Sequence, residues 1–173
     1  MTDSRRPHRV AIAVAPNGGR RTKADHPAIP LTPGELARTA AECLEAGAAM
    51  IHIHVRRDDG RHLLDADAYR RAIDAIRAAA GDRLVIQITT EALGLYAPAE
   101  QVAVLKAVRP EAASLALREL APDEAAETAF AEALDWMRRE NVFPQIILYD
   151  PMEAAPVMCA REERKATRSA DPG

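Results

Sequence analysis

Two histidines lie two residues apart in the apolar run Met50-Ile51-His52-Ile53-His54-Val55-Arg56. In a β-strand, residues i and i+2 point to the same face, so we expect both imidazoles to project together near the carboxyl end of a buried strand. Neutral imidazole is a good ligand for zinc and related metals. The spacing favours a site in which His52 and His54 bind one metal ion. Two core histidines that hydrogen-bond to their neighbours are the alternative.

The rest of the chain alternates between short apolar runs and helical patterns. Helix signals include Thr32-Pro33-Gly34-Glu35, where Thr32 can cap the helix and Glu35 completes a capping box. Strict alternation of strands and helices predicts right-handed crossovers and a parallel sheet that is buried on both faces. The predicted strands cover residues 10–15, 49–55, 84–90, 112–117 and 145–149. Predicted helices open near residues 32, 98 and 122, and a further helix carries Tyr69 and Ile76 on one face and ends at Gly81.

Polar residues gather where these strands end. In a (β/α)₈ barrel the site is built from the carboxyl ends of several strands, and four strands here end in polar residues: Asn17, His52, His54, Arg56, Gln87, Thr89, Thr90 and Ser114. A doubly wound nucleotide-binding sheet would need a glycine fingerprint after the first strand, and the loop 16–23 has none. We therefore predict an α/β fold, a partial (β/α)₈ TIM barrel made of βα units 1–4 plus strand 5.

The predicted domain covers residues 1–151 as the N-terminal part of a TIM barrel, and residues 152–173 form an unpatterned tail that we expect to be disordered. A net charge of −3 with interspersed signs and 3% aromatic residues argue against nucleic acid as a partner. No apolar run approaches the length of about 20 residues that spans a bilayer. Cys43 and Cys159 form no disulfide framework and no secretory signal is visible, so we expect a cytoplasmic protein.

Several motifs resemble the β-keto acid cleavage enzymes. They are Pro16-Asn-Gly-Gly19, the loop 22–33, the histidine strand within its Ala46-Gly-Ala context, Gln87-Ile-Thr-Thr90 and Pro110-Glu-Ala-Ala-Ser114. The resemblance runs from about Val10 to Asp150. It implies a zinc-dependent (β/α)₈ barrel that condenses a small β-keto acid with acetyl-CoA as co-substrate, releasing acetoacetate and a new acyl-CoA.

The resemblance also implies roles for individual residues. His52 and His54 would be two zinc ligands, and Asn17, Arg20, Thr89, Thr90 and Ser114 would bind the substrate. Thr89 stands where the family often has a serine that holds the substrate carboxylate. Arg20 stands where the lysine-fermentation member has a glutamate that meets the substrate's ammonium group. A cation at this position should disfavour amino-substituted keto acids.

A complete barrel needs about 250 residues, whereas this sequence ends after the fifth predicted strand. The resemblance places the third zinc ligand, a glutamate, and the catalytic acidic and basic groups on later strands. Catalytic residues are therefore not assigned. Two hypotheses remain: an enzyme of the β-keto acid cleavage type, and an inactive truncated fragment with at most a weak metal site. Exposed edges on the first and fifth strands would be compatible with homo-oligomerisation.

Overall fold

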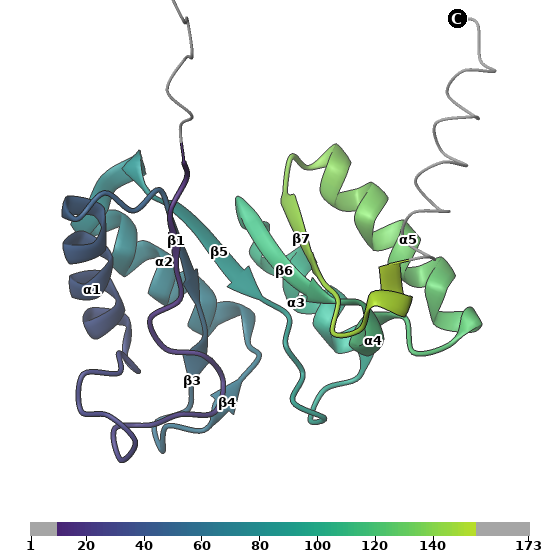
Figure 1. Ribbon diagram of the computed structural model, residues 1–173, viewed down its shortest axis with the longest axis horizontal. Helices are drawn as coiled ribbons and strands as arrows, with labels where there is room; N and C mark the ends of the chain where they lie inside the picture. The colour runs from purple at the N-terminus through teal and green to yellow at the C-terminus, as the bar shows by residue number, and fades with distance from the viewer. Residues whose placement is uncertain (1–9, 155–173) are drawn as a thin grey trace, which may run out of the picture.

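The computed structural model describes residues 10–154. A five-stranded parallel sheet forms its centre, in the order β1 (Ala13–Val14), β2 (Met50–Ile53), β5 (Val85–Thr89), β6 (Ala112–Ala116) and β7 (Phe143–Ile147). Figure 1 shows the sheet curled, with the helices arranged around its outer side. This arrangement confirms the prediction of a partial (β/α)₈ barrel. The part of the predicted tail after residue 154 lies outside the described residues.

Four longer helices connect the strands, and three of them begin at a side-chain cap. Thr32, Asp65 and Asp123 accept hydrogen bonds from backbone N–H groups of the first turns of α1, α2 and α5. The helices are α1 (Pro33–Glu45), α2 (Ala66–Ala80), α3 (Pro98–Val108), the short α4 (Leu117–Leu120) and α5 (Glu124–Arg139), with 3₁₀ turns η1 (Gly81–Arg83) and η2 (Pro151–Glu153). No helix among residues 10–154 has the length and apolar character to cross a membrane.

Replacing Glu35 with Gln is expected to lower the free energy of unfolding by about 1 kcal/mol at neutral pH. The ammonium of Lys23 and the N–H groups of Leu31 and Thr32 lower the pKa of Glu35 from 4.5 to about 2. Because the folded pKa lies below the unfolded value, this contribution is complete above about pH 4.5 and is lost as the pH falls toward about 2. Urea denaturation of both proteins at about pH 7 and about pH 3 should show the difference shrinking. An equal difference at the two pH values would contradict this assignment.

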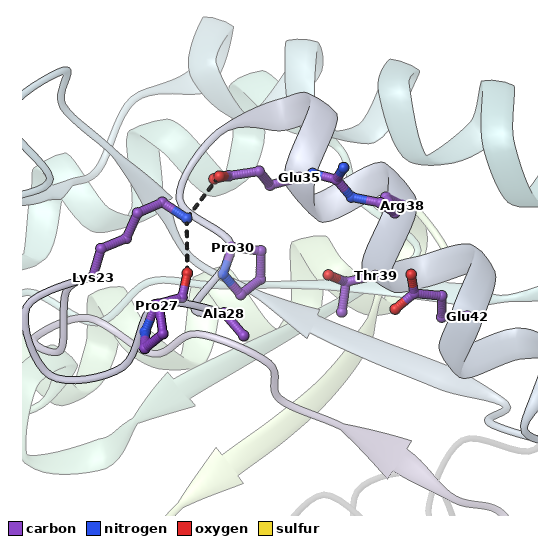
Figure 2. Close-up of a pocket in the computed structure, with 8 residues that line it drawn as sticks. All are labelled: Lys23, Pro27, Ala28, Pro30, Glu35, Arg38, Thr39 and Glu42. Carbon is purple, nitrogen blue, oxygen red and sulfur yellow. Dashed lines mark hydrogen bonds and ion pairs between the residues drawn. The ribbon is translucent and has the colours of Figure 1, made fainter.

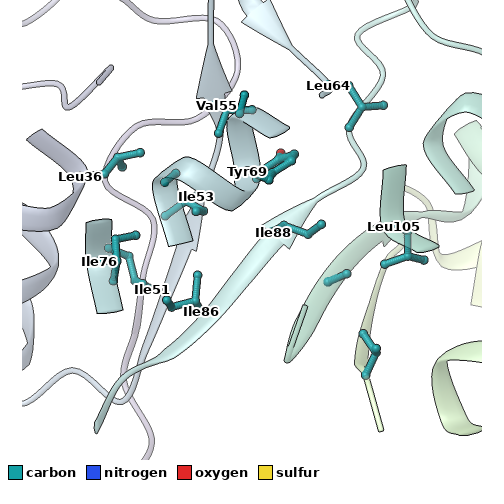
Figure 3. Packing of buried hydrophobic residues seen from close by; sticks show 14 of the residues in the cluster. Leu36, Ile51, Ile53, Val55, Leu64, Tyr69, Ile76, Ile86, Ile88 and Leu105 are labelled. Atoms are coloured by element: carbon teal, nitrogen blue, oxygen red, sulfur yellow. The ribbon is translucent and has the colours of Figure 1, made fainter. Parts of the chain in front are cut away.

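The two faces of the sheet differ in chemistry because side chains alternate along each strand. Figure 3 shows the outer face, where isoleucines of β2 and β5 pack against α1 and α2. This core includes Leu36, Ile51, Ile53, Tyr69, Ile76, Ile86 and Ile88, all at most 2% exposed. The register pairs His52 with Gln87 and Thr89 with Ser114, so these polar residues share the opposite, concave face. The concave face therefore carries the candidate chemistry.

The first strand differs from its prediction. Residues 10–15 were expected to form a buried strand, but only Ala13 and Val14 pair with β2. Val10 and Ile12 are 82% and 52% exposed. The apolar pattern predicts burial, whereas β1 is an edge strand with one neighbour among the described residues. The expectation of a sheet buried on both faces was wrong for this edge.

The last strand begins two residues earlier than predicted. The predicted strand covers residues 145–149, whereas β7 pairs with β6 from Phe143 to Ile147, with Pro144 opposite Ala113. Proline lacks an N–H donor and is tolerated at an edge strand, where one side of the backbone makes no ladder bond. Phe143 is 61% exposed for the same reason, since the described sheet ends at β7.

The predicted strand 49–55 divides into two parts at His54. After β2, the segment β3 (Val55–Arg56) leaves the sheet and pairs antiparallel with β4 (His62–Leu63). Gly60 adopts a φ of 80° in the turn, a conformation that glycine tolerates without steric cost. The predicted turn at residues 58–60 is confirmed, but the hairpin that it closes was not predicted. This hairpin brings a third histidine, His62, beside the pair.

Candidate metal and substrate site

The two predicted ligands face each other on the concave side of the sheet. His52 Nε2 and His54 Nε2 are 3.0 Å apart, and the rings meet edge to face with centroids 4.9 Å apart. Two nitrogen ligands at zinc distances of 2.0–2.1 Å and a tetrahedral angle stand about 3.3 Å apart. The pair therefore fits two positions of one zinc ion with little adjustment. The prediction that both imidazoles project together is confirmed.

Gln87 fixes the proton of His52. Its Oε1 lies 2.8 Å from His52 Nδ1, across the β2–β5 register. An amide oxygen only accepts hydrogen bonds, so Nδ1 carries the proton and Nε2 keeps a lone pair. Histidines that bind metals commonly donate their second ring N–H in this way. Gln87 thus presents His52 in the form that a metal requires.

Both histidines are neutral near pH 7. Burial, followed by the nearby His52, His62 and Arg56, lowers the pKa of His54 to about 3. Burial also lowers the pKa of His52, although the hydrogen bond to Gln87 opposes that effect. Neutral imidazole is the metal-binding form, because a protonated ring has no lone pair to donate.

The loop after β1 holds the backbone of His54. Asn17 Nδ2 donates to the carbonyls of His54 at 2.8 Å and Pro30 at 3.0 Å, and Oδ1 accepts from the N–H groups of Gly18 and His54. Asn17 therefore satisfies both backbone groups of His54 at the point where β2 ends. The predicted substrate contact of Asn17 stays a prediction, whereas its hydrogen bonds to the His54 backbone are present in the structure.

Arg56 also holds the loop after β1. Its guanidinium donates to the carbonyls of Gly18, Gly60 and Arg21. Arg56 is 8% exposed, and its guanidinium is hydrogen-bonded to the backbone of the loop and the hairpin. Arg56 thus joins the 18–21 loop to β3, which keeps the loop against the histidines.

The predicted substrate-binding residues on β5 and β6 lie next to each other. Thr89 Oγ1 accepts the N–H of Glu91 at 3.0 Å, which leaves its own O–H available as a donor. Thr90 Oγ1 donates to the Ser114 carbonyl at 3.3 Å. Ser114 Oγ is buried and has no hydrogen-bond partner among the described residues. A buried hydroxyl without a partner is unusual and is compatible with a polar ligand.

Arg20 stands apart from the buried group. It is exposed on the loop after β1. Burial raises the pKa of Tyr149, with Glu119 and Glu91 adding to the shift and Arg118 and Arg20 opposing it. The charge of Arg20 therefore acts on Tyr149 in the segment after β7. The Arg20 side chain is exposed to solvent.

Two residues beside the pair were missed by the sequence reasoning, His62 and Glu91. His62 Nε2 lies 2.6 Å from the Glu91 carbonyl, and Glu91 Oε2 lies 3.5 Å from His54 Nδ1. The Asp-Gly turn between two short runs was a signal for the hairpin that carries His62. Glu91 gave no comparable signal, because it follows a strand in a loop. Among the described residues, no three His, Cys, Asp or Glu side chains form a group that could hold a metal.

A hollow elsewhere in the chain does not coincide with this chemistry. Figure 2 shows this hollow between the 23–30 loop and α1. Its volume is about 250 Å³. Lys23 Nζ is already bound there to Glu35 Oε1 at 2.7 Å and to the carbonyls of Pro27 and Ile29. The ammonium of Lys23 and the carboxylate of Glu35 in this hollow therefore already bind each other. The histidine face is therefore the better candidate for function.

Known proteins match the chain along most of its length. The model of the β-keto acid cleavage enzyme family matches residues 9–169. The chain belongs to this family. The match includes the histidine strand, both loops that hold it and the ends of β5 and β6. The resemblance deduced from the motifs is thereby confirmed.

Two curated relatives illustrate the family. The 3-keto-5-aminohexanoate cleavage enzyme of Fusobacterium nucleatum is 39% identical over 87 residues, which are 50% of this chain and 32% of the relative. The 3-oxoadipate:acetyl-CoA acetyltransferase of Cupriavidus necator is 29% identical over 143 residues, which are 80% of this chain and 49% of the relative. The chain thus spans about a third to a half of the length of these relatives.

A solved structure supports the fold. The ternary complex of ObcA with a C4-CoA adduct and oxalate superposes with a TM-score of 0.60 at 19% sequence identity, covering 75% of this chain and 33% of that chain. The apo structure of ObcA gives a TM-score of 0.54. At this level of identity the similarity concerns the arrangement of strands and helices alone.

Proposed function

We propose that this chain supplies the metal-binding and keto-acid-binding part of a β-keto acid cleavage enzyme, which exchanges acyl groups between a β-keto acid and acetyl-CoA. The observation that carries the proposal is the pair of Nε2 atoms of His52 and His54, 3.0 Å apart at the carboxyl ends of the strands of a family barrel. The names of the relatives provide the reaction class, since one of them transfers acetyl groups with acetyl-CoA.

In this proposal His52 and His54 would hold a zinc ion. The ion would supply Lewis-acid polarisation of the ketone oxygen. Gln87 keeps the Nδ1 proton of His52 in place, and Asn17 holds the His54 backbone at the end of β2. Both side chains orient ligands rather than react. The remaining ligands of the ion are not assigned to residues of this chain.

The hydroxyls beside the pair would bind the keto acid. Ser114 Oγ is buried without a partner among the described residues, and Thr89 retains a free O–H. Each could donate to a substrate carboxylate, and such charge-assisted hydrogen bonds are stronger than neutral ones. Substrate contacts of Thr90 and Asn17 stay predictions, because their side-chain donors bind backbone carbonyls of the chain. Donors directed at this region would also stabilise the enolate and alkoxide charge that develops during carbon–carbon cleavage.

Arg20 would influence which keto acids are accepted. An exposed guanidinium on the loop after β1 attracts anionic groups and repels ammonium groups. We therefore propose neutral or anionic β-keto acids as the substrate class. An amino-substituted keto acid that proved the best substrate in a panel would contradict this part of the proposal.

The experiment that tests the proposal combines two measurements on the purified 173-residue chain. Zinc content is quantified, and acetoacetate release is followed with acetyl-CoA and a panel of β-keto acids. Bound zinc is the expected result for the proposed metal-binding part, and acetoacetate formation in addition would show that this chain also carries out the cleavage. A chain that binds no zinc would contradict the proposal. Zinc binding without acetoacetate release from any keto acid would favour the non-catalytic fragment.

A further inference from the structure

The carboxylate of Glu91 lies against the outer nitrogen of His54. Glu91 Oε2 and His54 Nδ1 are 3.5 Å apart, and the His54 side chain is 6% exposed. His54 Nδ1 makes no hydrogen bond with any described residue. A buried ring nitrogen beside a carboxylate is a candidate donor, because the carboxylate can only accept. The contact thus has a donor and an acceptor, but it is longer than an ordinary hydrogen bond.

The position of Glu91 is fixed by its neighbours. Its backbone N–H donates to Thr89 Oγ1 at 3.0 Å, and its carbonyl lies 2.6 Å from His62 Nε2. Gly19 leaves the space that the carboxylate occupies, since a Cβ added at Gly19 would stand 2.7 Å from Glu91 Oε2 and 3.4 Å from His54 Nδ1. The loop, the hairpin and β5 therefore all direct the carboxylate toward His54.

The positions of the ring protons on His52 and His54 determine whether Glu91 can accept a hydrogen bond from His54. A neutral imidazole carries one N–H. Because His52 Nδ1 donates to Gln87, His52 Nε2 is an acceptor, and the 3.0 Å contact requires the proton of His54 to lie on its Nε2. A metal shared by the pair needs lone pairs on both Nε2 atoms. The proton of His54 must then lie on Nδ1, facing Glu91.

We propose that Glu91 is a positioning residue that accepts the Nδ1–H of His54 when the pair binds a divalent metal, so that metal binding switches His54 from its Nε2–H to its Nδ1–H form. This inference rests on the proposed metal role of the pair. The proton relocates by exchange with water, and the charge of the imidazole does not change. Glu91 makes His54 a stronger ligand without touching the metal itself.

Zinc affinity of the 173-residue chain tests this role. Replacing Glu91 with Ala is expected to weaken zinc binding about 10- to 100-fold, the usual effect of losing a partner of a metal-bound histidine. Glu91→Gln should lose less, because its amide oxygen still accepts a hydrogen bond. Glu119→Gln is the matched control, since Glu119 is a nearby carboxylate that accepts the Ala92 N–H instead. Competition with a chromophoric chelator measures all of these affinities.

A second variant displaces the carboxylate without removing it. Gly19→Ala puts a methyl group at the Glu91 carboxylate and should weaken zinc binding in the same direction as Glu91→Ala. Gly34→Ala is its control. An added Cβ at Gly34 meets nothing within 4 Å, and this glycine lies in the first turn of α1, away from the contact between Glu91 and His54. Equal zinc affinities in the two glycine variants would contradict the role of Glu91.

The spectroscopic readout is the ¹⁵N spectrum of the histidine rings. On zinc addition, His54 is expected to change from an Nε2–H to an Nδ1–H signal that exchanges slowly with water, and Glu91→Ala should accelerate that exchange. Zinc coordinated through His54 Nδ1, or equal zinc affinity in the wild type and Glu91→Ala, would overturn this inference alone. A wild-type chain that binds no zinc would overturn the proposed metal role as well.

Discussion

Replacing His52 or His54 with Ala is expected to weaken zinc binding more than about 100-fold, which exceeds the cost of losing an outer partner of a ligand. The reason is geometric. The two Nε2 atoms are 3.0 Å apart, and either substitution leaves one imidazole where a zinc ion needs several ligands. If the His52→Ala and His54→Ala variants both bound zinc as tightly as the wild type, the zinc site would lie elsewhere in the chain.

The matched control is His26→Ala. His26 is an exposed histidine in the loop before α1, where its Nδ1 accepts the Ala28 N–H. Its removal should leave the zinc affinity unchanged. Circular dichroism and thermal denaturation of the variants separate loss of a ligand from loss of the fold. His54→Ala keeps the backbone groups that Asn17 binds, so the fold should persist.

The parallel half-barrel was predictable because its signals are local. Apolar runs of strand length alternate with helices, three of which are capped by Thr32, Asp65 and Asp123, and this alternation permits few topologies. The extent of β1 and β7 was not predictable. Both strands are edges of the described sheet, and an apolar residue in a strand pattern does not reveal whether a neighbouring strand covers it.

The candidate site was predictable where it depended on the period of a strand. His52 and His54 share a face because side chains alternate, and Gln87 joins them through the parallel register. His62 and Glu91 depend instead on the path of the chain after a strand ends. The hairpin turns His62 back, and the loop after β5 directs Glu91 toward His54. Such contacts arise from tertiary structure, so spacing along the sequence does not encode them.

Asn17 offers the complementary experiment, since it holds the site without being a proposed metal ligand. Asn17→Asp is expected to lower the free energy of unfolding by about 2–4 kcal/mol. The change keeps the acceptor for the Gly18 and His54 N–H groups but removes both donors, so two carbonyls, those of Pro30 and His54, face a carboxylate oxygen. Asn17 is 9% exposed, which means that water offers little compensation.

Urea denaturation measures this loss, and Asn141→Asp provides the control. Asn141 is an exposed residue with a φ of 57°, and the same chemical change there should alter the free energy of unfolding by no more than about 0.5 kcal/mol. In Asn17→Asp, zinc affinity should fall together with stability, because the His54 backbone loses the group that holds it at the end of β2. His54→Ala should instead remove zinc binding while the hydrogen bonds between Asn17 and the backbone of residue 54 remain. If Asn17→Asp matched the wild type in both stability and zinc affinity, the loop would not position His54. The strand β2 alone would then hold the two imidazoles together.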